Sequence, residues 1–185
     1  MERRTFTMKS KKEFNWQIWL EDVKEVEKSF NFYLKKEAIK QENENEFLPI
    51  SHLKKAEYNL KFINFLNDNK VFYDWIIIGC YYTIYHSALA LITKKGFSSK
   101  NHLATLCALI KFYYMGEKAL SKEEIELVSK SSLEKEEVSY FAYAKEKRET
   151  ASYGLSEEFN KIEAEDLLKK TIQFLNKCRE ILDSS

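Results

Sequence analysis

The chain has little of the two residues that make tight turns, with four Gly and one Pro among 185 residues. Average proteins use about 7% Gly and 5% Pro. Folds built from many β-hairpins need such residues at their turns, and their scarcity argues against a fold of that kind. We therefore predict an all-α fold of long helices with few connections.

Cysteine is also scarce. Cys80, Cys107 and Cys178 are odd in number, lie far apart and fall inside helical patterns, so they predict three buried thiols in a reducing compartment. Their spacing is not that of a metal site. The first residues lack the apolar stretch of a signal peptide, and no phosphate-binding glycine loop is present. We expect a cytoplasmic protein that has no metal and no cofactor.

Charge of one sign does not dominate the chain. Lys and Arg number 30 and Asp and Glu 29, which gives a net charge of +1, so the whole chain has no general attraction to nucleic acid. Residues 1–13 are a local basic cluster, which predicts either a flexible solvated arm or a tail that contacts phosphates. The length fits one domain, and we predict a single helical domain over residues 14–185.

The longest uncharged run extends from Trp75 to Ile92. A bilayer span needs about 20 predominantly apolar residues, so this run is at the lower limit. It carries Tyr81, Tyr82 and His86, and polar groups are costly in lipid. We predict that it is the buried central helix of a bundle and does not enter a membrane.

Apolar residues recur at three- and four-residue steps along most of the remaining chain, which predicts amphipathic helices. The first runs from 14 to about 40. The second begins at its N-cap, Ser51, and breaks within residues 67–70. The central helix ends at Gly96, and the fourth helix runs from 101 to 115, next to Gly116.

Two further helices complete the pattern. A capping box of Ser121 and Glu124 opens the fifth, which has apolar residues as far as Phe141, and Ser156 caps the last. Gly79 inside the central helix costs about 1 kcal/mol relative to Ala, which indicates that a neighbouring helix approaches closely there. The predicted fold is an antiparallel helical bundle around the central helix.

The three histidines give no metal-binding spacing. His52 follows the predicted N-cap and is expected to be exposed, while His102 opens the fourth helix and is expected to face solvent or to cap it. His86 lies in the central helix, where we predict a hydrogen-bonded core histidine. A catalytic role for His86 is the alternative.

The segment AKEKRETASYG, residues 144–154, has two interpretations. In the first, Arg148 caps carbonyl groups at the end of a helix and Tyr153 packs under the turn. In the second, Arg148 binds a phosphate, for which its planar guanidinium is suited, and Lys145 and Lys147 add positive charge. The residues alone leave both open.

Four segments together resemble the HEPN superfamily, and in particular the small prokaryotic HEPN proteins encoded beside a minimal nucleotidyltransferase. The segments are HLKKAEYNLKFINFLNDN, FYDWIIIGCYYTIYHSALALITKKG, SSKNHLATLCALIKFYY and RETASYG. Lys100 and His102 match a K-x-H element of the family. The resemblance covers a core of about residues 51–182, and the helix expected from 14 to 40 lies outside it as an additional N-terminal element.

The resemblance implies a four- or five-helix bundle, commonly a homodimer. Many members are metal-independent ribonucleases whose motif is an Arg, four to six residues, then a His, contributed by both protomers at the dimer cleft. Arg148 matches the Arg, and Tyr153 stands where the His is expected. An imidazole near pKa 6.5 exchanges protons at pH 7, whereas a phenol near 10 stays protonated. General-base catalysis contributes roughly 10²–10⁴-fold, so this difference should remove most of the activity.

The leading hypothesis is therefore a non-catalytic or weakly active dimeric binding module in a toxin–antitoxin-like pair. Its partner would be a minimal nucleotidyltransferase, a nucleotide or RNA. Arg148 and Tyr153 would form the cleft, with Lys145, Lys147, Lys100 and His102 as further nucleotide- or RNA-binding residues. The alternative is an active HEPN endoribonuclease in which Tyr153, His86 or His102 transfers the proton. A structural helical adaptor is the second alternative.

Overall fold

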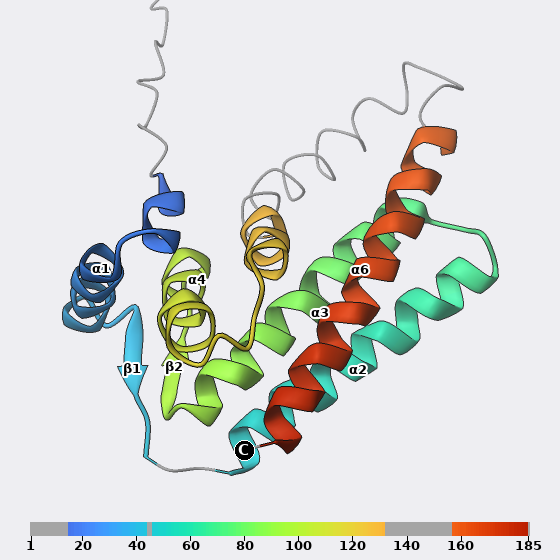
Figure 1. The fold of residues 1–185 in the computed structure, drawn as a ribbon. Helices are drawn as coiled ribbons and strands as arrows, with labels where there is room; N and C mark the ends of the chain where they lie inside the picture. Colours follow the sequence, from blue (N-terminus) through green and yellow to red (C-terminus); the bar gives the residue numbers. More distant parts are fainter. Residues whose placement is uncertain (1–14, 44–45, 132–156, 185) are drawn as a thin grey trace, which may run out of the picture.

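The computed structural model describes residues 15–43, 46–131 and 157–184, with no side chains described for 157–160. Helices make up nearly all of it, which confirms the all-α prediction (Figure 1). The elements in order are η1 (Trp16–Leu20), α1 (Val23–Lys35), β1 (Ile39–Gln41), α2 (Phe47–Asp68), α3 (Tyr73–Lys94), β2 (Phe97–Ser99), α4 (His102–Leu109), the π-helix η2 (Ile110–Gly116) and α6 (Glu157–Asp183). A further helix covers 122–131.

Helix α3 is the centre of the bundle, and α2 and α6 lie along it (Figure 1). It is the one helix in the described part of the chain that is long and apolar enough to cross a membrane, and 72% of its most apolar window is buried by the rest of the protein. Its buried hydroxyl groups are satisfied within the helix. Thr83 donates to Gly79 O and Ser87 donates to Thr83 O, both at 2.8 Å, so these polar residues are accommodated without a partner helix.

Helix α2 approaches α3 closely at Gly79, as the position of this glycine predicted. A Cβ atom built at Gly79 would overlap Cγ2 of Ile63 on α2. Ile63 is fully buried, so it has little room to move. The end of α3 is also as predicted, because Gly96 adopts a φ of +77° directly after the helix, a conformation that glycine adopts without steric cost.

The N-terminal part differs from the single helix predicted over 14 to 40. The side chain of Asp22 accepts hydrogen bonds from the backbone of Lys24 and Glu25 at 2.8 and 3.3 Å, so a new helix starts there and η1 stands apart from α1. After α1 the chain forms β1, which pairs antiparallel with β2, Ile39 opposite Ser99. The sequence had shown no strand pattern, because each strand has only three residues.

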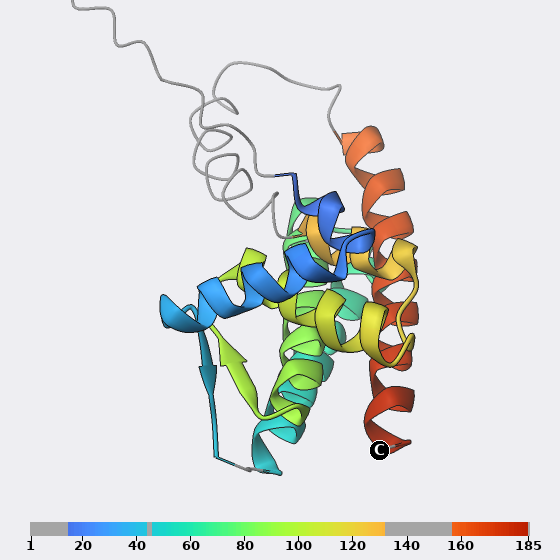
Figure 2. The ribbon, with the colours of Figure 1, turned by 60° about the vertical axis from the view of Figure 1, so that its left-hand side comes forward.

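This N-terminal part packs against α4 and η2 (Figure 2). Phe30 of α1 meets the rings of Phe97 and Phe112 at centroid distances of 5.3 Å. Lys111 of η2 forms an ion pair with Glu27 of α1. Residues 15–43 are therefore an integral part of the hydrophobic core.

One other predicted boundary moved, and one predicted helix changes its geometry. Helix α2 begins at Phe47, four residues before Ser51, because Pro49 is accepted in a first turn, where its missing N–H has no helical partner to bond. The fourth helix changes to π geometry at Ile110, which the apolar pattern does not reveal. The capping box is confirmed. Ser121 N donates to Glu124 at 2.6 Å, and Glu124 N donates to Ser121 at 3.3 Å.

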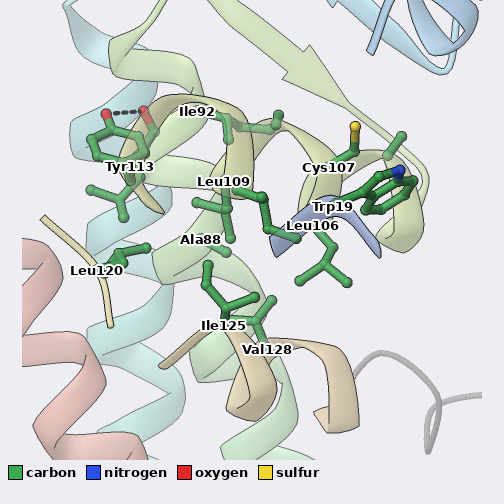
Figure 3. Packing of buried hydrophobic residues seen from close by; sticks show 14 of the residues in the cluster. Trp19, Ala88, Ile92, Leu106, Cys107, Leu109, Tyr113, Leu120, Ile125 and Val128 are labelled. Atoms are coloured by element: carbon green, nitrogen blue, oxygen red, sulfur yellow. Dashed lines mark hydrogen bonds between the residues drawn. The ribbon is translucent and has the colours of Figure 1, made fainter. Parts of the chain in front are cut away.

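The main core lies where α3, α4, η2 and the 122–131 helix meet (Figure 3). Tyr113 of η2 is buried, and its hydroxyl donates to the carbonyl of Leu91 on α3 at 2.7 Å. Ile125 and Val128 pack into the same cluster. All three cysteines are buried and unpaired with one another, as predicted. The predicted Ser156 cap and the part of the fifth helix that reaches Phe141 lie outside the described residues.

Candidate functional site

The predicted cleft residues Arg148, Tyr153, Lys145 and Lys147, like the arm at residues 1–13, lie outside the described residues. Both interpretations of Arg148 therefore stay predictions. Lys100 and His102 are described. Lys100 is exposed just before α4.

His52 on α2 and His86 on α3 form a close pair. Their Nδ1 atoms are 3.1 Å apart, and the ring planes are inclined by 28° with centroids 5.4 Å apart. His52 is half-buried, so the prediction that it is exposed was wrong. The reason is the earlier start of α2. Position 52 lies in the second turn of the helix, on the side that packs along α3. The hydrogen bond predicted for His86 is present, although the ring is only half-buried.

His102, the first residue of α4, bonds to Tyr81 of α3. The Tyr81 hydroxyl is 2.5 Å from Nε2 of His102. The N-cap of α4 is Asn101, whose side chain accepts a hydrogen bond from Ala104 N at 3.0 Å. His102 therefore neither caps α4 nor points freely to solvent, and its prediction was wrong. The ring of Tyr85 also lies against it, at a centroid distance of 4.1 Å.

These contacts form one network, which we name the His–Tyr cluster. Tyr85 connects its two halves, with centroid distances of 6.0 Å to His86 and 6.2 Å to Tyr81. All three histidines of the chain belong to it, from three different helices. Sequence reasoning missed it, because positions 52, 86 and 102 have no local spacing in common and meet only through packing. The members are His52, Tyr81, Tyr85, His86 and His102.

Burial shifts the pKa of three members of the cluster, His52, Tyr81 and Tyr85. It lowers the pKa of His52, because the charged imidazolium is poorly solvated there. It raises the pKa of Tyr81 and of Tyr85, whose phenolate forms are disfavoured in the same way. At neutral pH the cluster therefore offers a neutral imidazole at His52, with a nitrogen lone pair, and phenol groups that stay protonated. The His52 imidazole can accept a proton or a hydrogen bond through this lone pair, and the phenols do not form a phenolate nucleophile.

A second feature is an unusual number of exposed aromatic rings around the turn that joins α2 to α3, which we name the α2–α3 aromatic face. Tyr58, Phe62 and Phe65 are spaced by four and three residues and so lie on one side of α2, with exposed fractions of 67, 48 and 63%. Phe72 in the turn and Trp75 at the start of α3 are 66 and 55% exposed. Such a gathering on a monomer surface is typical of an interaction site.

Metal-binding groups of the usual size are absent from the described parts of the chain, where no three His, Cys, Asp or Glu side chains converge. The prediction of no metal rests on the sequence alone.

Comparison with known proteins gives two matches. Residues 51–181 match the family described as the HEPN domain. A protein of Methanocaldococcus jannaschii named "Putative toxin MJ0142" is 31% identical over 132 residues, which cover 71% of this chain and 80% of that protein. No solved structure matches the chain. The matched residues begin after the N-terminal part, which agrees with the extent of the resemblance noted in the sequence.

Proposed function

The chain belongs to the HEPN domain family, and from that premise we propose that it is a toxin-like binding module that acts as a homodimer and has little or no nuclease activity. The observation that carries the proposal is the α2–α3 aromatic face. The relative named as a toxin supports a toxin-like role. The Tyr at position 153 supports binding in preference to cleavage, because a protonated phenol is a poor general base at pH 7.

The size of the aromatic face suits a second copy of the chain. An aromatic side chain buries about 150–250 Å² when fully covered, and these five rings are roughly half exposed. Covering them would bury on the order of 500 Å² per copy, more than half of the roughly 800 Å² per partner of a standard interface. Aromatic residues of this kind are also those that carry most of the binding energy at interfaces.

The oligomeric state tests this proposal directly. Light scattering on a size-exclusion column at micromolar concentration should give a dimer for the wild type and a monomer for Trp75→Asp and for Phe65→Asp. Phe32→Asp is the matched control, because Phe32 is 54% exposed on α1, at the opposite side of the molecule from the α2–α3 turn (Figure 1). A monomeric wild type would contradict the proposal.

The bound partner is proposed to be anionic, a nucleotide or RNA, or a minimal nucleotidyltransferase that carries one. Arg148 would bind a phosphate with Lys145 and Lys147 beside it, since charge-assisted contacts of Arg to phosphate are strong and directional. Fluorescence anisotropy with a labelled single-stranded RNA should show binding that weakens at least 10-fold in Arg148→Ala. Lys130→Ala, at an exposed Lys on the 122–131 helix, is the control for a general loss of positive charge.

A metal-independent ribonuclease is the second candidate, and the His–Tyr cluster is the observation that favours it. The cluster brings His86 and His102, of a residue type that often serves as general acid or base, to a partly exposed surface. RNA cleavage by the purified protein in EDTA decides between the two. We expect no cleavage above a blank. Cleavage that disappears in Arg148→Ala would establish the enzyme, and further loss in Tyr153→Phe would place that hydroxyl in the mechanism.

A further inference from the structure

One side of α3 carries partly exposed rings from the α2–α3 turn as far as the His–Tyr cluster. Trp75, Tyr82 and His86 are spaced by seven and four residues, so they lie on the same side of the helix. Trp75 is 55% and Tyr82 41% exposed, and His86 is partly buried. Tyr82 therefore stands between the proposed dimer surface, to which Trp75 belongs, and the His–Tyr cluster.

The ring of Tyr82 packs against that of Tyr81. The two ring centroids are 5.0 Å apart, and the planes are inclined by 72°. Tyr81 is itself buried and fixed, because its hydroxyl bonds to His102 of α4 and its ring lies parallel to that of Tyr85. A ring that is already held in place loses little conformational freedom when a ligand packs on it. Tyr82 is thus a preorganised flat surface.

The same part of the chain is basic, although the whole chain is nearly neutral. Residues 75–116 contain four Lys and no Asp or Glu, and residues 47–66 of α2 add three exposed Lys and one acidic residue, Glu57. Glu57 pairs with an Arg of α6, and two of the four Lys also pair with carboxylates. Asp68 and Asp74 lie outside these ranges, at the α2–α3 turn. An anion near α3 and α4 therefore meets more positive charge than negative.

We propose that Tyr82 and the partly exposed edge of the His–Tyr cluster bind the unpaired bases of single-stranded RNA by stacking, while Lys100 contacts a phosphate. Lys100 is exposed two residues before His102, which Tyr81 connects to Tyr82. Sites for single strands combine aromatic rings with positive charge in this way. The bases of a duplex are stacked on one another and offer no free face, so a single strand is the form that fits.

This inference rests on the proposed function, because it names the form of RNA and a residue that contacts it. Fluorescence anisotropy of the full chain with a labelled single-stranded RNA tests the contact. We expect Tyr82→Ala to weaken binding by about 5-fold or more, the loss expected when one base no longer stacks. Tyr82→Phe keeps the ring and should bind within about twofold of the wild type. Tyr82→Leu keeps an apolar side chain without a ring and should bind as weakly as Tyr82→Ala.

Phe32→Ala is the matched control, because it removes a ring that is 54% exposed on α1, and it should leave the affinity unchanged. Light scattering should give the same oligomeric state for every variant as for the wild type, which separates a loss of stacking from a loss of the dimer.

A second comparison uses the wild type alone, so it does not depend on whether the variants fold. The same RNA annealed to its complement should bind at least about 10-fold more weakly than the single strand, although the duplex carries more phosphates. Equal affinity for strand and duplex would overturn this inference alone, and so would RNA binding that Tyr82→Ala leaves unchanged. A wild type that binds no RNA would overturn the proposed RNA partner together with it.

Discussion

The missing side chain at Gly79 allows α2 and α3 to pack as closely as they do. Alanine there would gain about 1 kcal/mol of helix propensity, but its Cβ would overlap Cγ2 of the buried Ile63. Overpacking of this kind costs typically 1–3 kcal/mol. We expect Gly79→Ala to lower the free energy of unfolding by about 1–2 kcal/mol, measured by urea denaturation.

A double-mutant cycle shows whether the overlap is the cause. Ile63→Ala alone should cost about 2–5 kcal/mol through the cavity it leaves. In that background Cγ2 is gone, so Gly79→Ala should become neutral or stabilising. An equal loss in both backgrounds would mean that the glycine is needed for another reason, such as its backbone conformation.

The three thiols lead to a prediction about reactivity. Burial raises the pKa of Cys80 and of Cys107 to about 12, and it raises the pKa of Cys178 well above its ordinary value. Only the thiolate reacts with disulfide reagents. At pH 8 the thiols of the native protein should therefore react with Ellman's reagent only as fast as local or global unfolding exposes them. In 8 M urea, where the thiols return to a pKa near 8.5, three should react at once. A thiol that reacts in the native state as fast as in urea would show that it is not buried.

Single residues also show where sequence reasoning stops. Gly96 and the Ser121 cap were predictable, because each acts through its own backbone or through a neighbour three residues away. Gly79 was predictable because a glycine inside a helix by itself indicates a close neighbour, although the sequence did not show that this neighbour is Ile63. His52 was not, because its environment depends on α3, more than 30 residues along the chain. The candidate cleft at Arg148 and Tyr153 could be proposed only from a family resemblance, since an Arg and a Tyr five residues apart also fit an ordinary helix end.

At the scale of elements, the central helix was predictable and the N-terminal part was not. The uncharged run from Trp75 to Ile92 is apolar nearly all round, so as a helix in a water-soluble fold it is expected to be buried. The apolar steps from Trp16 to Leu34 fit one helix equally well, and only the cap made by Asp22 divides η1 from α1. Strands of three residues, such as β1, are too short to show an alternating pattern.

Helix α1 gives the prediction that belongs to this scale. Phe30 is buried against the stacked rings of Phe97 and Phe112, whereas Phe32 on the same helix is 54% exposed. Phe30→Ala should therefore cost about 3–5 kcal/mol, and Phe32→Ala less than about 1 kcal/mol, both measured by chemical denaturation. Similar small losses for the two variants would contradict the packing of α1 into the core, and residues 15–43 would then be an appendage.

At the scale of the whole molecule, the described chain is a family core with one added part. The core from 51 to 181 matches the HEPN domain, and residues 15–43 cover α4 and η2 on the side away from the α2–α3 turn (Figures 1 and 2). The added part therefore leaves the aromatic face open. A dimer through that face can form without displacing any described element.

Dimerisation and anion binding are expected to fail together, because the family resemblance implies a cleft built by both protomers. In Trp75→Asp, which should be monomeric, RNA affinity should fall at least 10-fold although Arg148, Lys145 and Lys147 are unchanged. Phe32→Asp should keep both properties, and Arg148→Ala should stay dimeric while it loses RNA. Parallel light scattering and anisotropy on the same samples check this. A monomeric Trp75→Asp that binds RNA like the wild type would show that one protomer forms the whole binding site, and the shared cleft would have to be abandoned.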